Sequence, residues 1–230
     1  MSRLPGALTR RDRRAPATGT RAHRVVRRAA GLCLEYPDSA VLARVPLVRA
    51  ALAEIPEAPG AAEVTEFARY LAEEDPLRAQ QHHVEVFDLR ARRALHLTWW
   101  SDGDTRRRGL SLAALKERYR AHGLHPGDSG ELPDHLPAVL EYAALRPDDG
   151  AALLTEHRGA IELLRLALVT AGTPYALPLT AVCATLPGTS PSTEADARAL
   201  LRRDTLAPAD LAGPERVGVE PGPLPPGASA

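Results

Sequence analysis

The stretch LLTEHRGAIELLRLAL, residues 153–168, decides the fold class of this chain. Its apolar side chains recur every three or four positions, as at Leu154, Ile161 and Leu168. That spacing is the period of an α-helix with one face in a hydrophobic core. The stretch therefore predicts one long helix that carries His157 on its inward face.

Equivalent helical stripes cover most of the chain. The run from Leu95 to Trp100 is compatible with a β-strand, but it is short and flanked by arginines and turn residues. We therefore expect an all-α fold, in a single domain over residues 21–205. Residues 1–20, which are basic, and residues 206–230, which are Pro/Gly-rich, are predicted to be disordered tails. The other predicted inward faces are Val26/Ala29/Cys33, Val41/Val45/Val48/Leu52, Val64/Phe67/Ala68/Leu71, Leu77/Gln81/Val84/Phe87, Leu112/Leu115/Tyr119, Leu136/Val139/Leu140/Ala143 and Leu179/Val182/Cys183/Leu186.

Capping residues mark several of the expected helix ends. Asp38 and Asp104 each precede a helical stripe and can accept a hydrogen bond from its first turn. Gly123 follows a stripe at the position where a left-handed glycine ends a helix. Thr173 and Pro174 are the sequence of a cap and a first-turn proline.

The composition indicates a soluble globular protein without a global charge. The chain has 230 residues, 44% of them hydrophobic and 25% charged, with a formal net charge of zero. No overall field favours nucleic acid. No apolar run reaches the roughly 18–20 residues of a membrane span. The arginine pairs within residues 10–14 are not followed by the apolar segment of an export signal, so a cytoplasmic location is expected.

Neither cysteine has the neighbours of a metal site or a nucleophile. Cys33 and Cys183 lie inside apolar helical patterns and are expected to be reduced core thiols. His82 and His83 are adjacent, so on a helix their rings point about 100° apart and do not readily share one ion. We expect no metal and no cofactor of the protein's own, and His82 on the solvated side. Glycine-rich phosphate loops and a nucleophile elbow are also absent from the sequence.

The segment Leu97-Thr98-Trp99-Trp100-Ser101-Asp102-Gly103-Asp104 contains both tryptophans of the chain. Adjacent indoles in regular structure point in different directions, and each brings one N–H that needs a partner. At least one of Trp99 and Trp100 is therefore expected at the rim of a recognition surface. The Arg106-Arg107-Arg108 run that follows opens a helix, where the macrodipole disfavours cations. These arginines pair with nearby acids, contact an acidic partner, or are simply exposed.

A second unusual segment is Glu131-Leu132-Pro133-Asp134-His135-Leu136-Pro137. Asp134 suits the N-cap of a helix whose first three residues end at Pro137. His135, beside an acid at a helix start, is either an acid–base group or a surface histidine. An enzymatic alternative, a small hydrolase or nucleotide-binding protein, would use Asp134, His135 and Glu141. The last two are six residues apart and should project from roughly opposite faces of one helix.

Taken together, these segments resemble those of NarJ-type nitrate reductase assembly chaperones, within the TorD/DmsD-like group of redox-enzyme maturation chaperones. The resemblance covers about residues 24–190. The segments that carry it are Tyr36-Pro37-Asp38, Val84 to Arg90, Leu97 to Gly109, Glu131 to Pro137 and Leu154 to Arg158.

The resemblance implies an all-helical protein that is not an enzyme. Such chaperones bind the catalytic (alpha) subunit of nitrate reductase before it receives its cofactor, mainly through that subunit's N-terminal segment. They assist insertion of the molybdenum cofactor before the complex docks at the membrane, and neither bind nucleic acid nor insert into the membrane. A chaperone of another molybdoenzyme is the alternative client assignment.

The expected client-binding site follows from the same resemblance. The family's Asp-His pair falls on Asp134 and His135, and tyrosine is usual where this chain has His83 and commoner at Trp99. A groove for an apolar peptide needs aromatic and aliphatic walls with a few polar anchors. Its expected members are Phe87, Trp99, Trp100 and Leu136 on the walls, with Glu131, Pro133, Asp134 and His135 at the edge.

Overall fold

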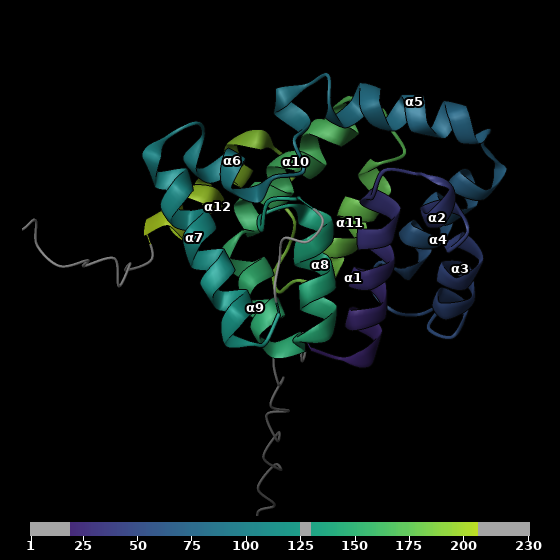
Figure 1. Cartoon of the computed structure of the whole chain (residues 1–230), viewed down its shortest axis with the longest axis horizontal. Helices are drawn as coiled ribbons and strands as arrows, with labels where there is room; N and C mark the ends of the chain where they lie inside the picture. Colours follow the sequence, from purple (N-terminus) through teal and green to yellow (C-terminus); the bar gives the residue numbers. More distant parts are fainter. Residues whose placement is uncertain (1–18, 125–129, 207–230) are drawn as a thin grey trace, which may run out of the picture.

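The computed structural model describes residues 19–124 and 130–206, which form helices joined by short connections (Figure 1). Within these ranges the only β-type pairing is an isolated antiparallel bridge between His96 and His135. The predicted all-α fold is confirmed. The helices are α1 (Arg21–Leu34), α2 (Ser39–Leu42), α3 (Val45–Ala53), α4 (Ala61–Glu73), α5 (Pro76–Phe87), α6 (Leu97–Asp102), α7 (Arg106–Ala121), α8 (Leu136–Leu145), α9 (Pro147–Glu156), α10 (Arg158–Thr170), α11 (Ala176–Ala184) and α12 (Glu194–Leu206), with a 3-10 turn η1 (Ala91–Arg93).

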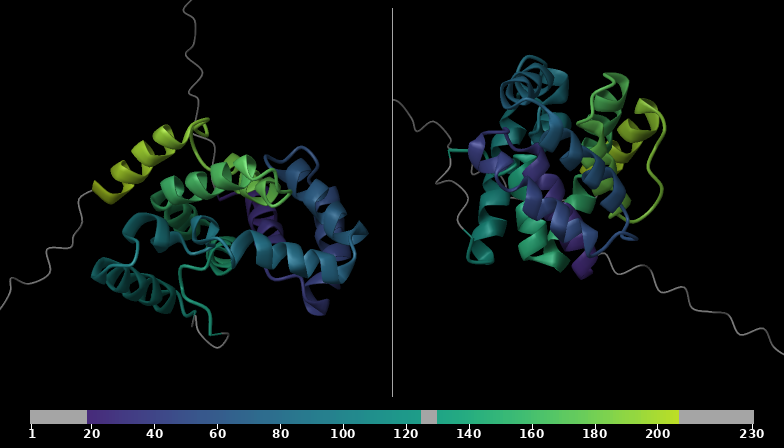
Figure 2. Two further views of the ribbon diagram at one scale, coloured as in Figure 1. Left: turned by 90° about the horizontal axis from the view of Figure 1, so that it is seen from above. Right: turned by 90° about the vertical axis from the view of Figure 1, so that its right-hand side faces the viewer.

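Helix α1 lies at the centre of the packing. It contacts α8, α11 and α4, and its residues Val26, Ala30 and Leu34 are completely buried. Helices α3 and α4 pack together on one side of α1, whereas α12 lies beside α10 at the opposite end of the molecule (Figures 1 and 2). The N-terminal helix is thus surrounded by helices from the middle and the end of the chain.

The predicted long helix over residues 153–168 is wrong. The chain forms two helices there, and His157 is a half-buried cap between α9 and α10 rather than an inward residue of one helix. Long-range contacts fix the direction of α10 just after this break. A Cβ on Gly159 would lie 2.4 Å from the Cα of Leu201 in α12, and Arg158 donates to the carbonyl of Gly188 at 3.1 Å.

The predicted inward face of α5 is rotated from the observed one. Leu77 is 61% exposed and Gln81 is also exposed, while Ala79, His83 and Val86 are buried together with the correctly assigned Phe87. His82 is half-buried rather than solvated, because its ring nitrogens bond the Tyr70 hydroxyl at 2.7 Å and the Thr173 hydroxyl at 3.1 Å. Polar partners on α4 and before α11 set this rotation.

The other local expectations had mixed outcomes. Asp38 caps α2 by accepting from Val41 N–H at 2.8 Å, and Gly123 ends α7 with φ +71°, as predicted. Asp104 does not cap α7, whose N-cap is Thr105 without a side-chain bond. Thr173 is not the N-cap of α11 either, because α11 starts after Tyr175.

Both cysteines are buried free thiols, as expected, and burial raises the pKa of Cys33 to about 12. In the part of the chain that the structure covers, no helix has both the length and the apolarity to cross a membrane. Most of the two predicted tails, residues 1–18 and 207–230, lie outside the described residues.

Candidate functional site

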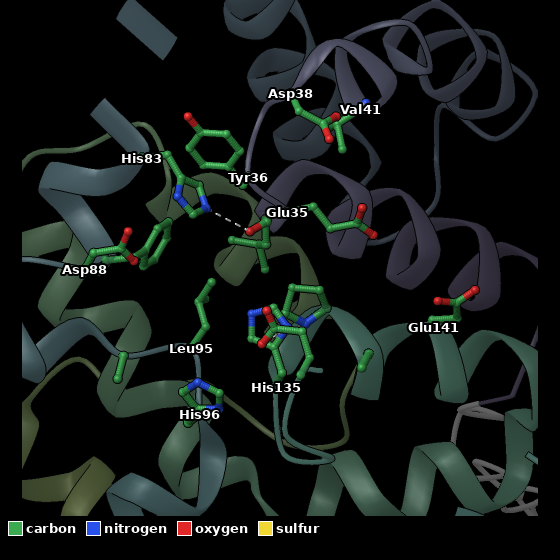
Figure 3. Close-up of a pocket in the computed structure, with 16 residues that line it drawn as sticks. Glu35, Tyr36, Asp38, Val41, His83, Asp88, Leu95, His96, His135 and Glu141 are labelled. Carbon is green, nitrogen blue, oxygen red and sulfur yellow. Dashed lines mark hydrogen bonds and ion pairs between the residues drawn. The ribbon is translucent and has the colours of Figure 1, made fainter. Parts of the chain in front are cut away.

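A cavity of about 860 Å³ lies where the end of α1 meets α5 and the beginning of α8 (Figure 3). The connection from α1 to α2, helix α2 itself, and the connections before α6 and before α8 also supply lining residues. Its apolar lining includes Leu34, Tyr36, Val41, Phe87, Leu95 and Pro137. Three imidazoles (His83, His96, His135) and five carboxylates (Glu35, Asp38, Asp88, Glu131, Glu141) also face it.

The bridge between His96 and His135 builds the floor of this cavity. Leu136 N–H donates to the Leu95 carbonyl at 2.8 Å, and Leu97 N–H donates to the Asp134 carbonyl at 3.0 Å. The two imidazoles lie side by side with ring centroids 5.4 Å apart. Helices α6 and α8 both begin immediately after the bridge, so it fixes two helix starts at once.

Asp134 caps a helix other than the predicted one. Its carboxylate accepts from the Thr98 N–H at 3.1 Å and from the Thr98 hydroxyl at 2.5 Å, both in the first turn of α6. The N-cap of α8 is His135, which makes no side-chain cap bond. The first turn of α8 has less need of a cap, because Leu136 N–H is bonded to Leu95 and Pro137 has no N–H.

The Asp134 side chain is fully buried, so its charge depends on these partners. Burial acts to raise the pKa of Asp134, but hydrogen bonds from His96 and Thr98 outweigh it and lower the pKa overall. His96 Nδ1 lies 3.0 Å from the carboxylate, which can only accept, so this nitrogen carries the proton. Asp134 therefore holds His96 in one tautomer at the cavity wall and does not face the cavity itself.

His135 and Glu131 lie together at the cavity edge. His135 Nδ1 is 3.8 Å from a Glu131 oxygen, and the His135 side chain is 19% exposed. Burial lowers the pKa of His135, against the attraction of Glu131. His135 and Glu141 both line the cavity, so the expectation that they face opposite sides of α8 is wrong.

His83 and Phe87 form the α5 wall. His83 Nε2 lies 3.2 Å from the Leu34 carbonyl, and the ring meets Tyr36 edge-on at 5.5 Å. Phe87 packs against His83 and against Tyr175 of the core, with centroid distances of 4.9 Å in both cases. Burial lowers the pKa of His83.

The two tryptophans lie behind the wall rather than in it. Trp100 Nε1 donates to the carbonyl of Ala94, a lining residue, at 3.0 Å. Trp99 is half-buried, with the Arg108 guanidinium 5.7 Å from its ring centroid. Arg108 also lies 3.9 Å from the Asp134 carboxylate, and Arg107 lies 3.2 Å from Asp102, so two of the three arginines pair with nearby acids.

Of the expected site residues, the structure brings Phe87, Glu131 and His135 into one cavity. Leu136 is fully buried in the core, and Pro133 is buried with its carbonyl accepting from the Tyr119 hydroxyl at 2.9 Å. The sequence reasoning missed Glu35 and Glu141 as wall residues. A signal was available only for the neighbouring Tyr36-Pro37-Asp38 segment, because Glu35 alone carries no pattern.

Comparisons with known proteins identify the family of this chain. Residues 56–181 match the family described as nitrate reductase delta subunit. The chain is 41% identical over 162 residues to the nitrate reductase-like protein NarX of Mycobacterium tuberculosis. The aligned residues make up 70% of this chain and 24% of NarX. It is 38% identical over 120 residues to the nitrate reductase molybdenum cofactor assembly chaperone NarJ of Escherichia coli, covering 51% of this chain and 50% of NarJ.

The fold itself is similar to that of a proposed redox enzyme maturation protein from Archaeoglobus fulgidus. The TM-score is 0.52 at 20% identity, over 78% of this chain and 92% of the other. The aligned part of this chain spans only about a quarter of NarX and half of NarJ. The family match covers more than half of the chain, which belongs to the nitrate reductase delta subunit family.

Proposed function

We propose that this protein is an assembly chaperone for the catalytic subunit of a respiratory nitrate reductase. It binds the subunit before the molybdenum cofactor is inserted, mainly through the subunit's N-terminal segment, and releases it for docking at the membrane after loading. The cofactor is cargo of the client and is not held by the chaperone. The protein acts by binding, without a catalytic step of its own.

The observation that carries this proposal is the cavity at the α1–α5–α8 junction. Its volume of about 860 Å³ falls in the usual range of ligand sites, which is roughly 300–1,000 Å³. Its wall combines aromatic and aliphatic side chains, such as Tyr36, Phe87 and Leu95, with carboxylates and imidazoles. A short amphipathic segment can bury its apolar side chains against the former and place polar groups against the latter.

The expected site residues have different roles under this proposal. Phe87, Glu131 and His135 contact the client segment directly. Asp134 and Leu136 are positioning residues, since both are fully buried and hold the start of α6 or α8 in place. The Trp100 indole is bonded to Ala94 of the cavity wall, so its fluorescence should respond when the cavity fills.

The burial of Asp134 favours binding over hydrolysis. A general base must come within hydrogen-bond reach of its substrate, whereas this carboxylate has no exposed surface and is bonded to Thr98 and His96. The alternative is that the client is another molybdoenzyme. Comparing peptides from the two candidate clients in the same assay distinguishes these possibilities.

The test is isothermal titration of the full chain with a synthetic peptide of the catalytic subunit's first 20 or so residues, with tryptophan fluorescence in parallel. We expect saturable binding and a change in indole emission, and no heat from a scrambled peptide. Phe87→Ala should weaken binding, while the exposed control Leu77→Ala on the same helix should not. Absence of binding to this peptide, together with binding to the equivalent peptide of another molybdoenzyme, would reassign the client.

A further inference from the structure

The cavity's chemistry specifies what kind of segment it accepts. We propose that the end of the cavity formed by Glu35 and Glu141 is a subsite for a cationic side chain, arginine or lysine, of the client segment. This inference rests on the proposed function, because it names the chemistry of the segment that the same cavity binds.

The lining carries charge of one sign. Five carboxylates face the cavity, and none of its lining residues is a lysine or an arginine. A concave wall of low dielectric concentrates the field of such a set and raises the local concentration of cations. The same field repels phosphates, so the cavity is poorly suited to a nucleotide or to the dinucleotide part of a cofactor.

Glu35 and Glu141 are brought together by the packing of α8 on α1. Glu35 follows the last residue of α1, and Glu141 lies in the second turn of α8. One guanidinium, that of Arg28, already lies between them, at 3.8 Å from Glu35 and 3.2 Å from Glu141. The site geometry is therefore compatible with a planar cation that contacts both carboxylates.

Arg28 leaves much of this acceptor capacity unused. Each carboxylate can accept about four hydrogen bonds, and the contacts from Arg28 are single and long. The Glu35 side chain is 30% exposed and that of Glu141 is 47% exposed, so both are accessible to a ligand. Burial raises the pKa of Glu35 overall, although the charges of Arg28 and Arg44 act to lower it and that of Glu141 acts with burial.

A separate observation shows that the wall also has an acceptor without a donor. The Leu34 carbonyl can only accept, so His83 Nε2 must donate to it and Nδ1 is the lone-pair nitrogen of a neutral ring. That Nδ1 is buried, and the described residues give it no hydrogen-bond partner, although buried polar atoms are normally bonded. The carboxylates and this nitrogen are acceptors that match a guanidinium or ammonium group, which only donates.

The experiment compares charged and neutralised peptides on the full chain. The probe is the peptide of the catalytic subunit's first 20 or so residues, with each arginine replaced singly by citrulline and each lysine by acetyl-lysine. Titration calorimetry should find one position at which neutralisation weakens binding to the wild-type chain about tenfold or more. In Glu35→Gln and Glu141→Gln, the same neutralisation should have a much smaller effect, because the partner charge is already gone.

Two further variants separate electrostatics from structural damage. Arg28→Gln removes the internal cation that competes for both carboxylates, so the cationic peptide should bind more tightly. Arg21→Gln is the matched control on the same helix, because its guanidinium pairs with exposed Glu54 outside the cavity, and it should leave affinity unchanged. Glu117→Gln on α7 is the corresponding acidic control.

The outcomes distinguish this inference from the function on which it rests. If every neutralised peptide binds as well as the parent, the cationic subsite is refuted while the chaperone function stands. An equal loss in the wild-type chain and in both glutamate variants would place the cation elsewhere and overturn the assignment to this cavity. If the parent peptide does not bind at all, the proposed function fails and this inference fails with it.

Discussion

Asp134 caps the helix that contains Thr98, although 36 residues separate the two in sequence. The carboxylate takes up both the N–H and the hydroxyl of Thr98 and is itself fully buried. A buried carboxylate is stable only when its acceptor sites are filled, so the two residues depend on one another. This contact ties the segment before α8, which carries His135, to the first turn of α6.

Loss of this cap should destabilise the fold. Asp134→Ala leaves the Thr98 donors without a partner inside the protein, and we expect a loss of about 3 kcal/mol in the free energy of unfolding. Urea unfolding followed by circular dichroism measures this change. Thr98→Val should cost less, and the double variant should cost less than the sum of the two. Additive losses would show that the two residues are not coupled.

Stability should fall as the medium becomes mildly acidic. Burial lowers the pKa of His83 and His157 below the ordinary value of 6.5, so the unfolded chain binds protons that the folded chain does not. Each group therefore costs stability as pH falls from about 6.5 through its lower folded pKa. In His83→Phe, the slope of unfolding free energy against pH should be shallower between pH 7 and 5. An unchanged slope would contradict a depressed pKa at this site.

Helix α7 should be held to α9 mainly by one arginine. Arg118 donates to Asp149 at 2.7 and 3.0 Å and to Glu156 at 2.6 and 3.2 Å, whereas only Leu115 and Tyr119 of α7 are buried. We expect Arg118→Gln to cost about 1–2 kcal/mol and to speed amide hydrogen exchange in α7 before other helices.

The matched control for this change is Arg120→Gln. Arg120 is on the same helix, but its side chain is 59% exposed and lies 3.7 Å from Glu117, which is 75% exposed. Exposed pairs of this kind contribute little, so exchange rates in α7 should stay at the wild-type level. Comparable loosening of α7 in both variants would show that the Asp149 and Glu156 contacts are not what hold it.

A methyl group between α10 and α12 should separate these helices. In Gly159→Ala the new Cβ would lie 2.4 Å from both the N and the Cα of Leu201. Contacts this short require the backbone of α10 or α12 to move. We expect a loss of about 1–3 kcal/mol and a lower Tm in calorimetry. Gly109→Ala is the control, because that helical glycine has no atom within 4 Å of the new position and should gain up to about 1 kcal/mol.

Features that depend on neighbouring residues could be predicted from the sequence. The spacing of Val64, Phe67, Ala68 and Leu71 predicts the buried face of α4, and all four are buried. The same reasoning predicted α8 and its inward face correctly, with the start displaced by one residue. Such patterns work because a helix repeats its exposure every three or four positions whatever it packs against.

Features that depend on distant partners could not be predicted in this way. Local capping rules assign Asp134 to the helix that follows it, α8. In the structure its carboxylate instead accepts from Thr98 in α6. The cavity wall is a second case. Glu35 and Glu141 lie 106 positions apart, and only the packing of α8 against α1 places them on either side of Arg28.

The packing of α8 on α1 also means that the two parts of the cavity wall are synthesised at different times. The first half of the cavity wall, around Leu34 and Tyr36, leaves the ribosome long before the second half, around His135 and Glu141. At translation rates of about 5–20 residues per second, the two halves are separated by roughly 5–20 seconds. Until α8 and α11 emerge, α1 exposes the apolar face of Val26, Ala30 and Leu34. The cavity wall is therefore complete only after Glu141, the last of its lining residues, has been synthesised.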